Sequence, residues 1–414
     1  MRGEPFFGWR VVAAVFTLAV FGWGLGFYGP PIMLHAVHEA RGWSLSLVST
    51  AITVHFLLGA LFVASLARLA ARFGMANLTR AGAIAAAIGV LGWASATAPW
   101  QLMLASVATA FGWAMMGAAA VNALITPWFV TKRPAALASA YNGASVGGIV
   151  FSPLLVWLIA QLGLQAAMLA VGVVTVAVMW WASGHYFARS PAQMGLAADG
   201  EPGAVRADAP PRVETAAPLR DGALWKDTRF LLLVTGMSLG LFAQVGVIAH
   251  MFSLLVPALG PQMAGFAAGG ATIAAITGRT LSGLVLSARG DRATFAAMSY
   301  GVQMAGLALL LMAGGTYVPL LLAGVLLFGL GIGNAISLPP LIAQARFTAA
   351  DAARVVPMIV AVSQATYAFA PAAFGMIRDS ASSGSAPALY ATAMALMAAA
   401  IVCLLAIPRA TISD

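Results

Sequence analysis

Twelve long apolar stretches run through this sequence of 414 residues. Each has about 20 residues or more, the length that an α-helix needs to cross roughly 30 Å of hydrocarbon. The sequence therefore predicts an all-α polytopic membrane protein. The expected spans cover residues 10–34, 45–67, 77–98, 100–126, 134–160, 164–187, 229–256, 263–288, 293–313, 318–345, 353–377 and 386–408.

Composition supports a lipid environment and argues against a nucleic-acid partner. Hydrophobic residues make up 61% of the chain and charged residues 8%, against about 25% charged residues in soluble domains. The net charge of +9 would suit nucleic acid only if the basic residues clustered on one exposed face, but they lie in short loops between apolar stretches. Cys403 is the single cysteine, so neither an intrachain disulfide nor a cysteine-based metal site is expected.

One long polar interval divides the chain into two halves. Residues 188–228 are rich in proline and charge and cannot bury a core, so we expect a disordered linker between halves 1–187 and 229–414. The halves also repeat each other. Phe111-Gly112 opens the fourth stretch and Phe328-Gly329 opens the tenth, an offset of about 217 residues that predicts two parallel six-helix halves.

The distribution of basic residues predicts the orientation in the membrane. All but three of the 21 Lys and Arg residues lie at the termini, in the loops on the same side as the termini, or in the linker. Arg41 and Arg378 fall on the opposite side, and Arg279 falls inside a span. Because cytoplasmic loops carry the positive charge, we expect both termini in the cytoplasm and a location in the cytoplasmic (inner) membrane.

Two loops carry similar motifs. Leu69-Ala-Ala-Arg72-Phe-Gly74 follows the second span, and a similar run from Gly283 to Arg292 follows the eighth. Both resemble the loop signature of the major facilitator superfamily. Ala71 and Ser287 stand where the family signature has an aspartate. In that family the loop latches neighbouring helix ends through a charge network, so the missing acids imply a latch that is weaker or built from other groups.

Further motifs are similar to the bacterial monocarboxylate and oxalate/formate branch of that superfamily. That resemblance implies a secondary transporter working by alternating access, in which Arg279 matches a carboxylate-binding arginine of span eight. The chain departs from the family pattern at Ala275, where animal monocarboxylate carriers have an aspartate, and it lacks the span-eleven lysine of oxalate exchangers. The motifs are Gly8-Trp9-Arg10, Trp128-Phe129 with Lys132-Arg133, Ser190-Pro191 with Met194-Gly195-Leu196, and Gly278-Arg279 with Gly283.

Arg279 is the strongest candidate for a substrate contact. Ionisable groups inside a membrane are costly and mark functional sites, and a guanidinium can bind a carboxylate through two parallel hydrogen bonds. Arg279 lies ten residues before Arg289, which marks the cytoplasmic edge of the expected span. Ten residues correspond to about 15 Å of helix rise, a distance that the side chain does not easily bridge. The alternative is that Arg279 reaches the membrane rim or backbone carbonyls.

Seven other polar residues complete the predicted substrate site. Either histidine could titrate near neutral pH or make a structural hydrogen bond, and the others could contact substrate or join helices. The acidic residues all fall in expected loops or termini, so any proton coupling would have to use the histidines or the substrate itself. The seven are His55, His250, Asn122, Tyr28, Asn334, Gln364 and Tyr367.

The sequence thus predicts a secondary active or facilitative transporter of a small organic anion, in particular a monocarboxylate. Efflux of neutral or anionic drug-like compounds is the alternative. An enzyme is not expected, because the spans offer no nucleophile with a base, no paired carboxylates and no metal cluster. The expected partners are the substrate and the lipid bilayer, with no cofactor, and we expect a monomer.

Overall fold

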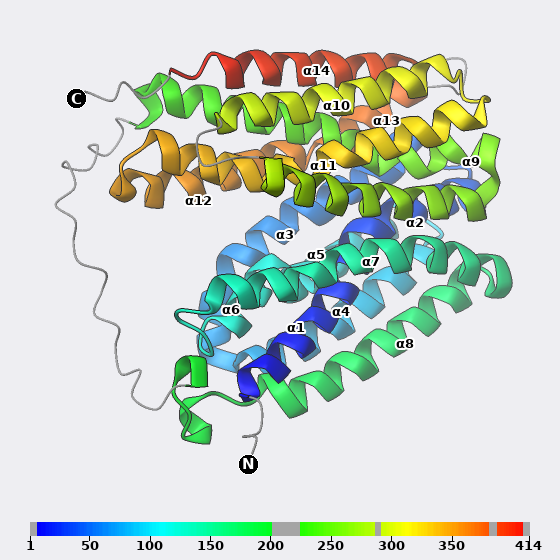
Figure 1. The fold of residues 1–414 in the computed structure, drawn as a ribbon. Coiled ribbons are helices and arrows are strands. Elements are labelled where there is room, and N and C mark those ends of the chain that lie inside the picture. Colours follow the sequence, from blue (N-terminus) through cyan, green and yellow to red (C-terminus); the bar gives the residue numbers. More distant parts are fainter. Residues whose placement is uncertain (1–5, 201–223, 286–290, 381–386, 409–414) are drawn as a thin grey trace. The chain divides into compact units, whose positions relative to one another are not determined.

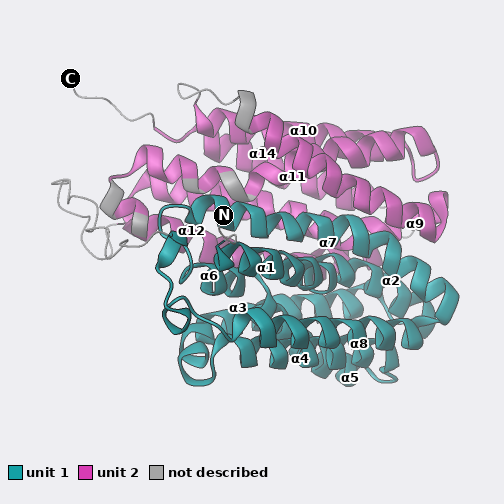
Figure 2. Ribbon diagram, turned by 60° about the horizontal axis from the view of Figure 1, so that its bottom comes forward, with its two compact units in different colours: residues 1–210 teal, residues 211–414 magenta. Residues whose placement is uncertain are grey.

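The structure is a computed structural model that describes residues 6–200, 224–285, 291–380 and 387–408. Throughout these residues the regular elements are helices (Figure 1), which confirms the predicted all-α class. Clustering of contacts divides the chain into two compact units, residues 1–210 and 211–414 (Figure 2). We describe each unit by itself, and the exact division into halves and linker stays a prediction.

The predicted number of spans agrees with the described helices. Eleven helical stretches of the described residues are long and apolar enough to cross a membrane. One of them, Thr228–Ser282, has 55 residues, or about 80 Å of helix, more than twice the hydrocarbon thickness. It turns at Gly260, whose φ of 70° and ψ of 163° are not helical. This stretch therefore holds two of the predicted spans, and twelve result.

Unit 1 contains the first six spans, and two of them are interrupted. The first span changes to a π-helix, η1, in its middle, and the fourth span breaks at Gly117, whose ψ is −160°. A Cβ at Gly117 would lie 2.6 Å from the carbonyl oxygen of Trp113, so the break depends on glycine. The elements are α1 (Phe7–Trp23), η1 (Gly24–Tyr28), α2 (Gly29–Arg41), α3 (Leu45–Phe73), α4 (Met75–Ser95), α5 (Pro99–Met116), α6 (Ala118–Ile125), α7 (Arg133–Leu162), α8 (Leu164–Ala182) and η2 (Ser183–Phe187).

Small residues allow the helices of unit 1 to pack closely. A Cβ at Gly147 of α7 would lie 2.5 Å from the carbonyl oxygen of Val20 in α1. Leu18 of α1 is fully buried in the same region. Because lipid is as apolar as leucine, close van der Waals packing rather than exclusion from water holds membrane helices together, and glycine at the contact lets the backbones meet.

Unit 2 contains the other six spans and has a similarly close pair, α9 and α11. A Cβ at Gly278 of α9 would collide with the carbonyl oxygen of Leu330 in α11. This contact positions the neighbouring Arg279 against α11. The elements are α9 (Thr228–Val285), α10 (Arg292–Met312), α11 (Val318–Arg346), α12 (Ala349–Tyr367), α13 (Ala370–Ser380) and α14 (Pro387–Leu405), preceded by the short turn η5 (Leu224–Lys226).

The first part of the expected linker is ordered. Short 3-10 turns η3 (Ala192–Met194) and η4 (Ala198–Gly200) follow the sixth span. The carboxylate of Asp199 accepts hydrogen bonds from the backbone N–H groups of Val130, Thr131 and Lys132 at 3.1, 2.8 and 3.1 Å. Composition alone did not reveal this contact, because it depends on a loop about 70 residues earlier. Residues 201–223 lie outside the described part.

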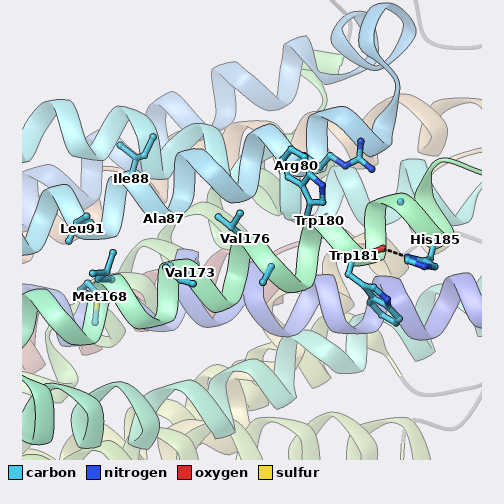
Figure 3. A pocket seen from close by; sticks show the side chains of 14 residues that line it. Arg80, Ala87, Ile88, Leu91, Met168, Val173, Val176, Trp180, Trp181 and His185 are labelled. Atoms are coloured by element: carbon cyan, nitrogen blue, oxygen red, sulfur yellow. Dashed lines mark hydrogen bonds between the residues drawn. The ribbon is translucent and has the colours of Figure 1, made fainter.

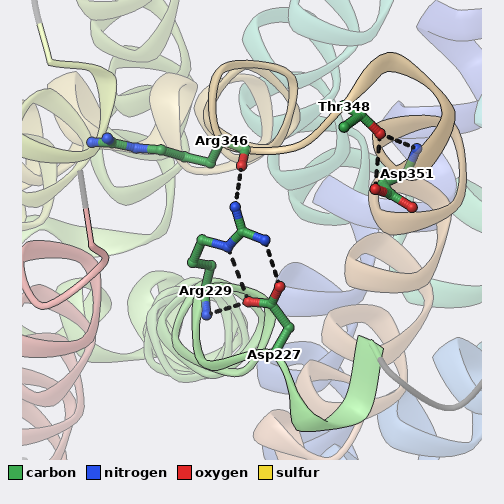
Figure 4. A network of polar contacts seen from close by, with 5 residues as sticks. All are labelled: Asp227, Arg229, Arg346, Thr348 and Asp351. Carbon is green, nitrogen blue, oxygen red and sulfur yellow. Dashed lines mark hydrogen bonds and ion pairs between the residues drawn. The ribbon is translucent and has the colours of Figure 1, made fainter. Parts of the chain in front are cut away.

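A charge network joins the helix ends of unit 2. Asp227 pairs with Arg229 at 2.6 Å, and Arg229 donates to the backbone carbonyl of Arg346 at 2.9 Å (Figure 4). The side chain of Arg346 in turn pairs with Asp291 at 2.9 Å. Near it, the Thr348 hydroxyl donates to Asp351 (Figure 4). Ion pairs therefore link helix ends in unit 2, as the family's loop signature does. The acids are Asp227 and Asp291, not a residue at the aspartate position of the signature. That position holds Ser287, which lies in the undescribed residues 286–290.

Candidate functional site

Arg279 lies on α9 and is exposed. Its Nε donates to the carbonyl oxygen of Gly333 in α11 at 3.1 Å. Among the described residues, neither of its terminal nitrogens has a hydrogen-bond partner and no carboxylate pairs with it. Guanidinium carries five donors in a fixed fork, so one anchored N–H leaves the outer edge available for a planar acceptor.

Asn334 is adjacent to Gly333 on α11, but its side chain is buried and occupied. The amide nitrogen donates to the hydroxyls of Ser282 at 2.7 Å and Ser299 at 3.1 Å. Each serine donates in turn to a carbonyl of its own helix. Such a network joins α9, α10 and α11, which is the structural role that polar groups often have between membrane helices.

Gln364 and Tyr367 lie together near the end of α12, and both are half-buried. The helix stops at Tyr367 and α13 starts at Ala370, so the eleventh span is broken at this point. Transporter binding sites are commonly built where membrane helices are discontinuous. These two residues therefore stay candidates for substrate contact.

His250 of α9 is fully buried at this same break. Its Nε2 lies 3.0 Å from the carbonyl oxygen of Pro371, and Nη1 of Arg378 lies 3.5 Å from its Nδ1. A carbonyl only accepts and an arginine only donates, so these contacts select the neutral imidazole with the proton on Nε2. Arg378, expected in an outer loop, lies in α13 and also donates to the Ser253 hydroxyl.

His55 of α3 is buried beside the π-helix of the first span. Its Nε2 lies 3.0 Å from the carbonyl oxygen of Gly26, and its Nδ1 lies 2.9 Å from the Thr109 hydroxyl. That hydroxyl also lies 3.1 Å from the Ser106 carbonyl. Because the hydroxyl has one proton, it donates either to neutral His55 or to Ser106, and in the second case Nδ1 must be protonated. Thr109 therefore accommodates both charge states.

Asn122 belongs to an aromatic and polar cluster of unit 1 that includes Trp23, Trp113 and Tyr141. Its amide nitrogen donates to the Tyr141 hydroxyl at 2.6 Å and to the Ala118 carbonyl at 2.9 Å. The ring of Trp23 lies 5.2 Å from that of Trp113 and 5.9 Å from that of Tyr141. Tyr28 lies farther along η1, with its ring 5.2 Å from Phe27. Both interrupted spans of unit 1 thus contribute to or flank this region.

The described acidic residues avoid the interior of the spans. Glu39, Asp351 and Asp379 do lie in helices, contrary to the expectation of loops, but each is in a first or last turn. Over the described ranges, no group of three or more His, Cys, Asp and Glu residues could hold a metal ion. The candidate site of unit 2 thus offers the exposed cation of Arg279. That of unit 1 offers the aromatic rings of Trp23, Trp113 and Tyr141.

Sequence reasoning missed three residues that the structure brings into these clusters: Tyr141, Thr109 and Arg378. Tyr141 lay in a conspicuous Ala-Tyr-Asn-Gly run but without a visible partner. Its bond to Asn122 joins residues 19 positions apart, and no helical periodicity links the two because they lie in different spans.

Three comparisons with known proteins bear on this architecture. Residues 11–371 match the family described as the Major Facilitator Superfamily. A search of curated proteins finds no match. Among solved structures, the nucleoside transporter NupG is similar with a TM-score of 0.73 at 12% identity, covering 97% of this chain and 98% of that one.

Two other solved structures share the fold. A D-xylose-proton symporter has a TM-score of 0.71 at 14% identity, with 98% of each chain covered. A bacterial homologue of the lysosomal transporter Spinster has a TM-score of 0.67 at 14% identity, covering 98% of this chain and 95% of that one. At such identities the structures show the fold alone. The family match extends over most of the chain, so this multi-pass membrane protein is a transporter and not an enzyme, and it belongs to the major facilitator superfamily.

Proposed function

We propose that this transporter moves a small organic anion, in particular a monocarboxylate, by alternating access. The observation that carries the proposal is the exposed guanidinium of Arg279, which is anchored to Gly333 through one N–H and has its terminal nitrogens unpaired among the described residues. A carboxylate can accept two parallel N–H bonds from such a fork. A substrate of this class would supply the missing counter-charge.

The surroundings of Arg279 support an anion rather than a cation as substrate. No acid of the described residues lies in the interior of a span, so no carboxylate is in place to hold a cation there. The buried Asn334 contributes through the Ser282 and Ser299 network, which secures α9 against α11 near the arginine. Its proposed role is to position Arg279, with Gln364 and Tyr367 as further contacts.

Efflux of neutral or anionic drug-like compounds is the second candidate, and the aromatic cluster of unit 1 favours it. Trp23, Trp113 and Tyr141 present ring faces and edges, which suit planar apolar molecules. Asn122 is exposed, and among the described residues its side-chain oxygen accepts no hydrogen bond. A neutral ring compound with a donor group could use both features.

Transport into proteoliposomes distinguishes the two functions. The parent protein would be assayed with labelled monocarboxylates, dicarboxylates and neutral ring compounds, together with Arg279→Gln, Trp113→Ala and, as a charge-loss control, Lys226→Gln on the exposed turn η5. The proposal expects monocarboxylate transport that Arg279→Gln abolishes and Lys226→Gln preserves. Transport of neutral compounds that survives Arg279→Gln but is lost in Trp113→Ala would assign the efflux function instead.

We further propose the setting in which this transport occurs. In this proposal both termini lie in the cytoplasm and the protein lies in the inner membrane, which the distribution of basic residues supports. The protein acts as a monomer with halves 1–187 and 229–414 joined by linker 188–228. Alternating access follows from two similar halves that move as units. Labelling from each side of the membrane tests the orientation.

A further inference from the structure

A long groove runs between α4 and α8 on unit 1 (Figure 3). Its volume is about 890 Å³, and its walls are almost entirely apolar. Gly172 of α8 and Ala87 of α4 bring the two helices close together, since a Cβ at Gly172 would lie 3.0 Å from the Ala87 Cβ. Ile88 and Val173, which are 61% and 59% exposed, stand beside this line. The groove is therefore accessible from outside the unit at this level.

Polar groups gather at one end of the groove. Arg80, Trp180, Trp181 and His185 lie at that end, whereas Leu91 and Met168 line the other (Figure 3). The guanidinium carbon of Arg80 lies 5.0 Å from the Trp180 ring centroid, and its Nη1 donates to the Asn77 side chain at 3.2 Å. These two contacts hold the cation in place over the groove.

Arg80 retains donors that no described group accepts. Its Nε is buried and has no hydrogen-bond partner among the described residues, and no carboxylate of that part pairs with it. An unsatisfied buried donor costs free energy, and the cost is greater for a charged group. A ligand in the groove cannot reach the covered Nε, but Nη2 also has no hydrogen-bond partner among the described residues. A phosphate group, which has several oxygens and a negative charge, is an acceptor that suits the terminal nitrogens.

The dimensions of the groove match one leaflet of a bilayer. Arg80 is five residues from the start of α4 and His185 is two residues from the end of η2, so both lie near the same end of two antiparallel helices. From Arg80 to Leu91 the helix rises about 16 Å, and half of a 30 Å hydrocarbon core is about 15 Å. Trp180 and Trp181 at the polar end fit the interfacial belt where membrane proteins place tryptophan.

We propose that the α4–α8 groove binds an anionic phospholipid, with one acyl chain along Ile88 and Val173 and the phosphate on the guanidinium of Arg80. A plain apolar groove would exchange lipids without preference, because bilayer lipid already surrounds it. A cation at headgroup depth between membrane helices makes the site selective for anionic lipid. The orientation proposed above places this lipid in the inner leaflet.

The test uses the purified full-length protein, stripped of lipid in detergent and titrated with phosphatidylglycerol or with phosphatidylcholine of the same chains. Native mass spectrometry counts the lipids bound per chain. The parent should retain one phosphatidylglycerol in preference to phosphatidylcholine. Arg80→Gln should weaken phosphatidylglycerol binding about tenfold, the loss expected for a charged hydrogen bond, and should leave phosphatidylcholine binding unchanged.

Matched variants separate the groove from the general surface. Val173→Trp fills the groove and should displace the lipid, whereas Val174→Trp, at a site 51% exposed that does not line the groove, should not. Arg68→Gln removes an exposed charge of α3 and should have no effect. A monodisperse peak in size-exclusion chromatography establishes that a variant is folded. If Arg80→Gln is not folded, Arg80→Lys takes its place in the binding test.

Three results would overturn the proposal. Equal affinity of the parent for phosphatidylglycerol and phosphatidylcholine would show that the groove does not select lipids by charge. Full competition by inorganic phosphate would assign Arg80 to a free anion rather than to a lipid. A dimer in the same spectra that Val173→Trp dissociates would assign the groove to a second copy of the chain.

Discussion

Nη2 of Arg346 lies 2.9 Å from Oδ1 of Asp291, and this ion pair joins the end of α11 to the start of α10. Burial by itself would raise the pKa of Asp291, but hydrogen bonds from Thr294 and the Ala293 N–H, together with the charge of Arg346, outweigh it and hold the pKa below its usual value. Asp291 therefore contributes stability when ionised. The loop signature lacks its aspartate, and this neighbouring pair supplies a charged link in unit 2.

Asp291→Asn should destabilise the protein at neutral pH. Asparagine still caps the helix through its one side-chain oxygen, so the variant removes the ion pair and the oxygen that accepts from Thr294. For a partly exposed pair we expect a loss of about 1 kcal/mol or less. Because the folded pKa is lowered, the difference between parent and variant should be present above the ordinary aspartate pKa of about 4 and should fade as the pH drops below it. Thermal unfolding of parent and variant in detergent at several pH values measures the difference in stability. A difference that stays constant down to the lowest pH would show that ionised Asp291 does not contribute through its charge.

Asp199→Asn should loosen the loop that precedes α7. Burial by itself would raise the pKa of Asp199, but three backbone N–H bonds and the charge of Lys132 hold it below its usual value. Asparagine tolerates the left-handed backbone at this position, where φ is 61°, so the change removes charge without new strain. Amide exchange at Val130, Thr131 and Lys132 should quicken about tenfold. Glu39→Gln, at an exposed acid of α2, is the control, and unchanged exchange in Asp199→Asn would show that the carboxylate does not hold this loop.

Arg279→Lys should weaken monocarboxylate binding without abolishing it. Lysine keeps the charge but loses the planar fork and the bond to Gly333, so we expect a loss of about 1.5 to 3 kcal/mol in binding. Calorimetry on the purified protein measures the affinity. Binding as tight as that of the parent would show that geometry at this position is unimportant.

Proton coupling, if present, should depend on His55 and not on His250. Arg378 and the Pro371 carbonyl hold His250 neutral, whereas the Thr109 hydroxyl can accept a hydrogen bond from the protonated Nδ1 of His55. Thr109→Val should therefore move the pH profile of proton-driven uptake to lower pH, since the protonated ring loses its acceptor. His250→Gln should leave the profile in place and cost roughly 1 to 3 kcal/mol of stability. An unchanged profile in both Thr109→Val and His55→Gln would remove His55 from the coupling path.

Labelling of single cysteines should place both termini in the cytoplasm. Replacing Cys403 by serine yields a cysteine-free chain, because it is the single cysteine. The exposed Glu39 and Thr316 are suitable label sites. The neighbouring Gly42 and Gly315 are not, since their φ values of 64° and 73° are left-handed. An impermeant reagent added outside should label cysteines at Glu39 and Thr316 and spare a cysteine at Gly203. Labelling at Gly203 from outside would reverse the orientation.

The fold class and the number of spans could be predicted from the sequence. Apolar stretches of membrane length leave the chain no other way to satisfy its backbone polar groups, and the match of these stretches to the helices follows from that constraint. It also predicted that Arg279 is an intramembrane cation, because a charge in an expected span is visible without any fold. The turn at Gly260 lies in the gap between the predicted spans 229–256 and 263–288, so the division of α9 into two spans also follows from the sequence.

The partners of each polar group were decided by tertiary structure alone. His55 and His250 looked equivalent in the sequence, yet one faces a hydroxyl that can donate or accept and the other faces an arginine that can only donate. Asn334 looked like a cavity residue and is enclosed by two serines. The groove at Arg80 also has no signature in the chain. A hydrogen bond depends on atoms within about 3 Å, and residues from different helices reach that distance only when the packing of those helices is set.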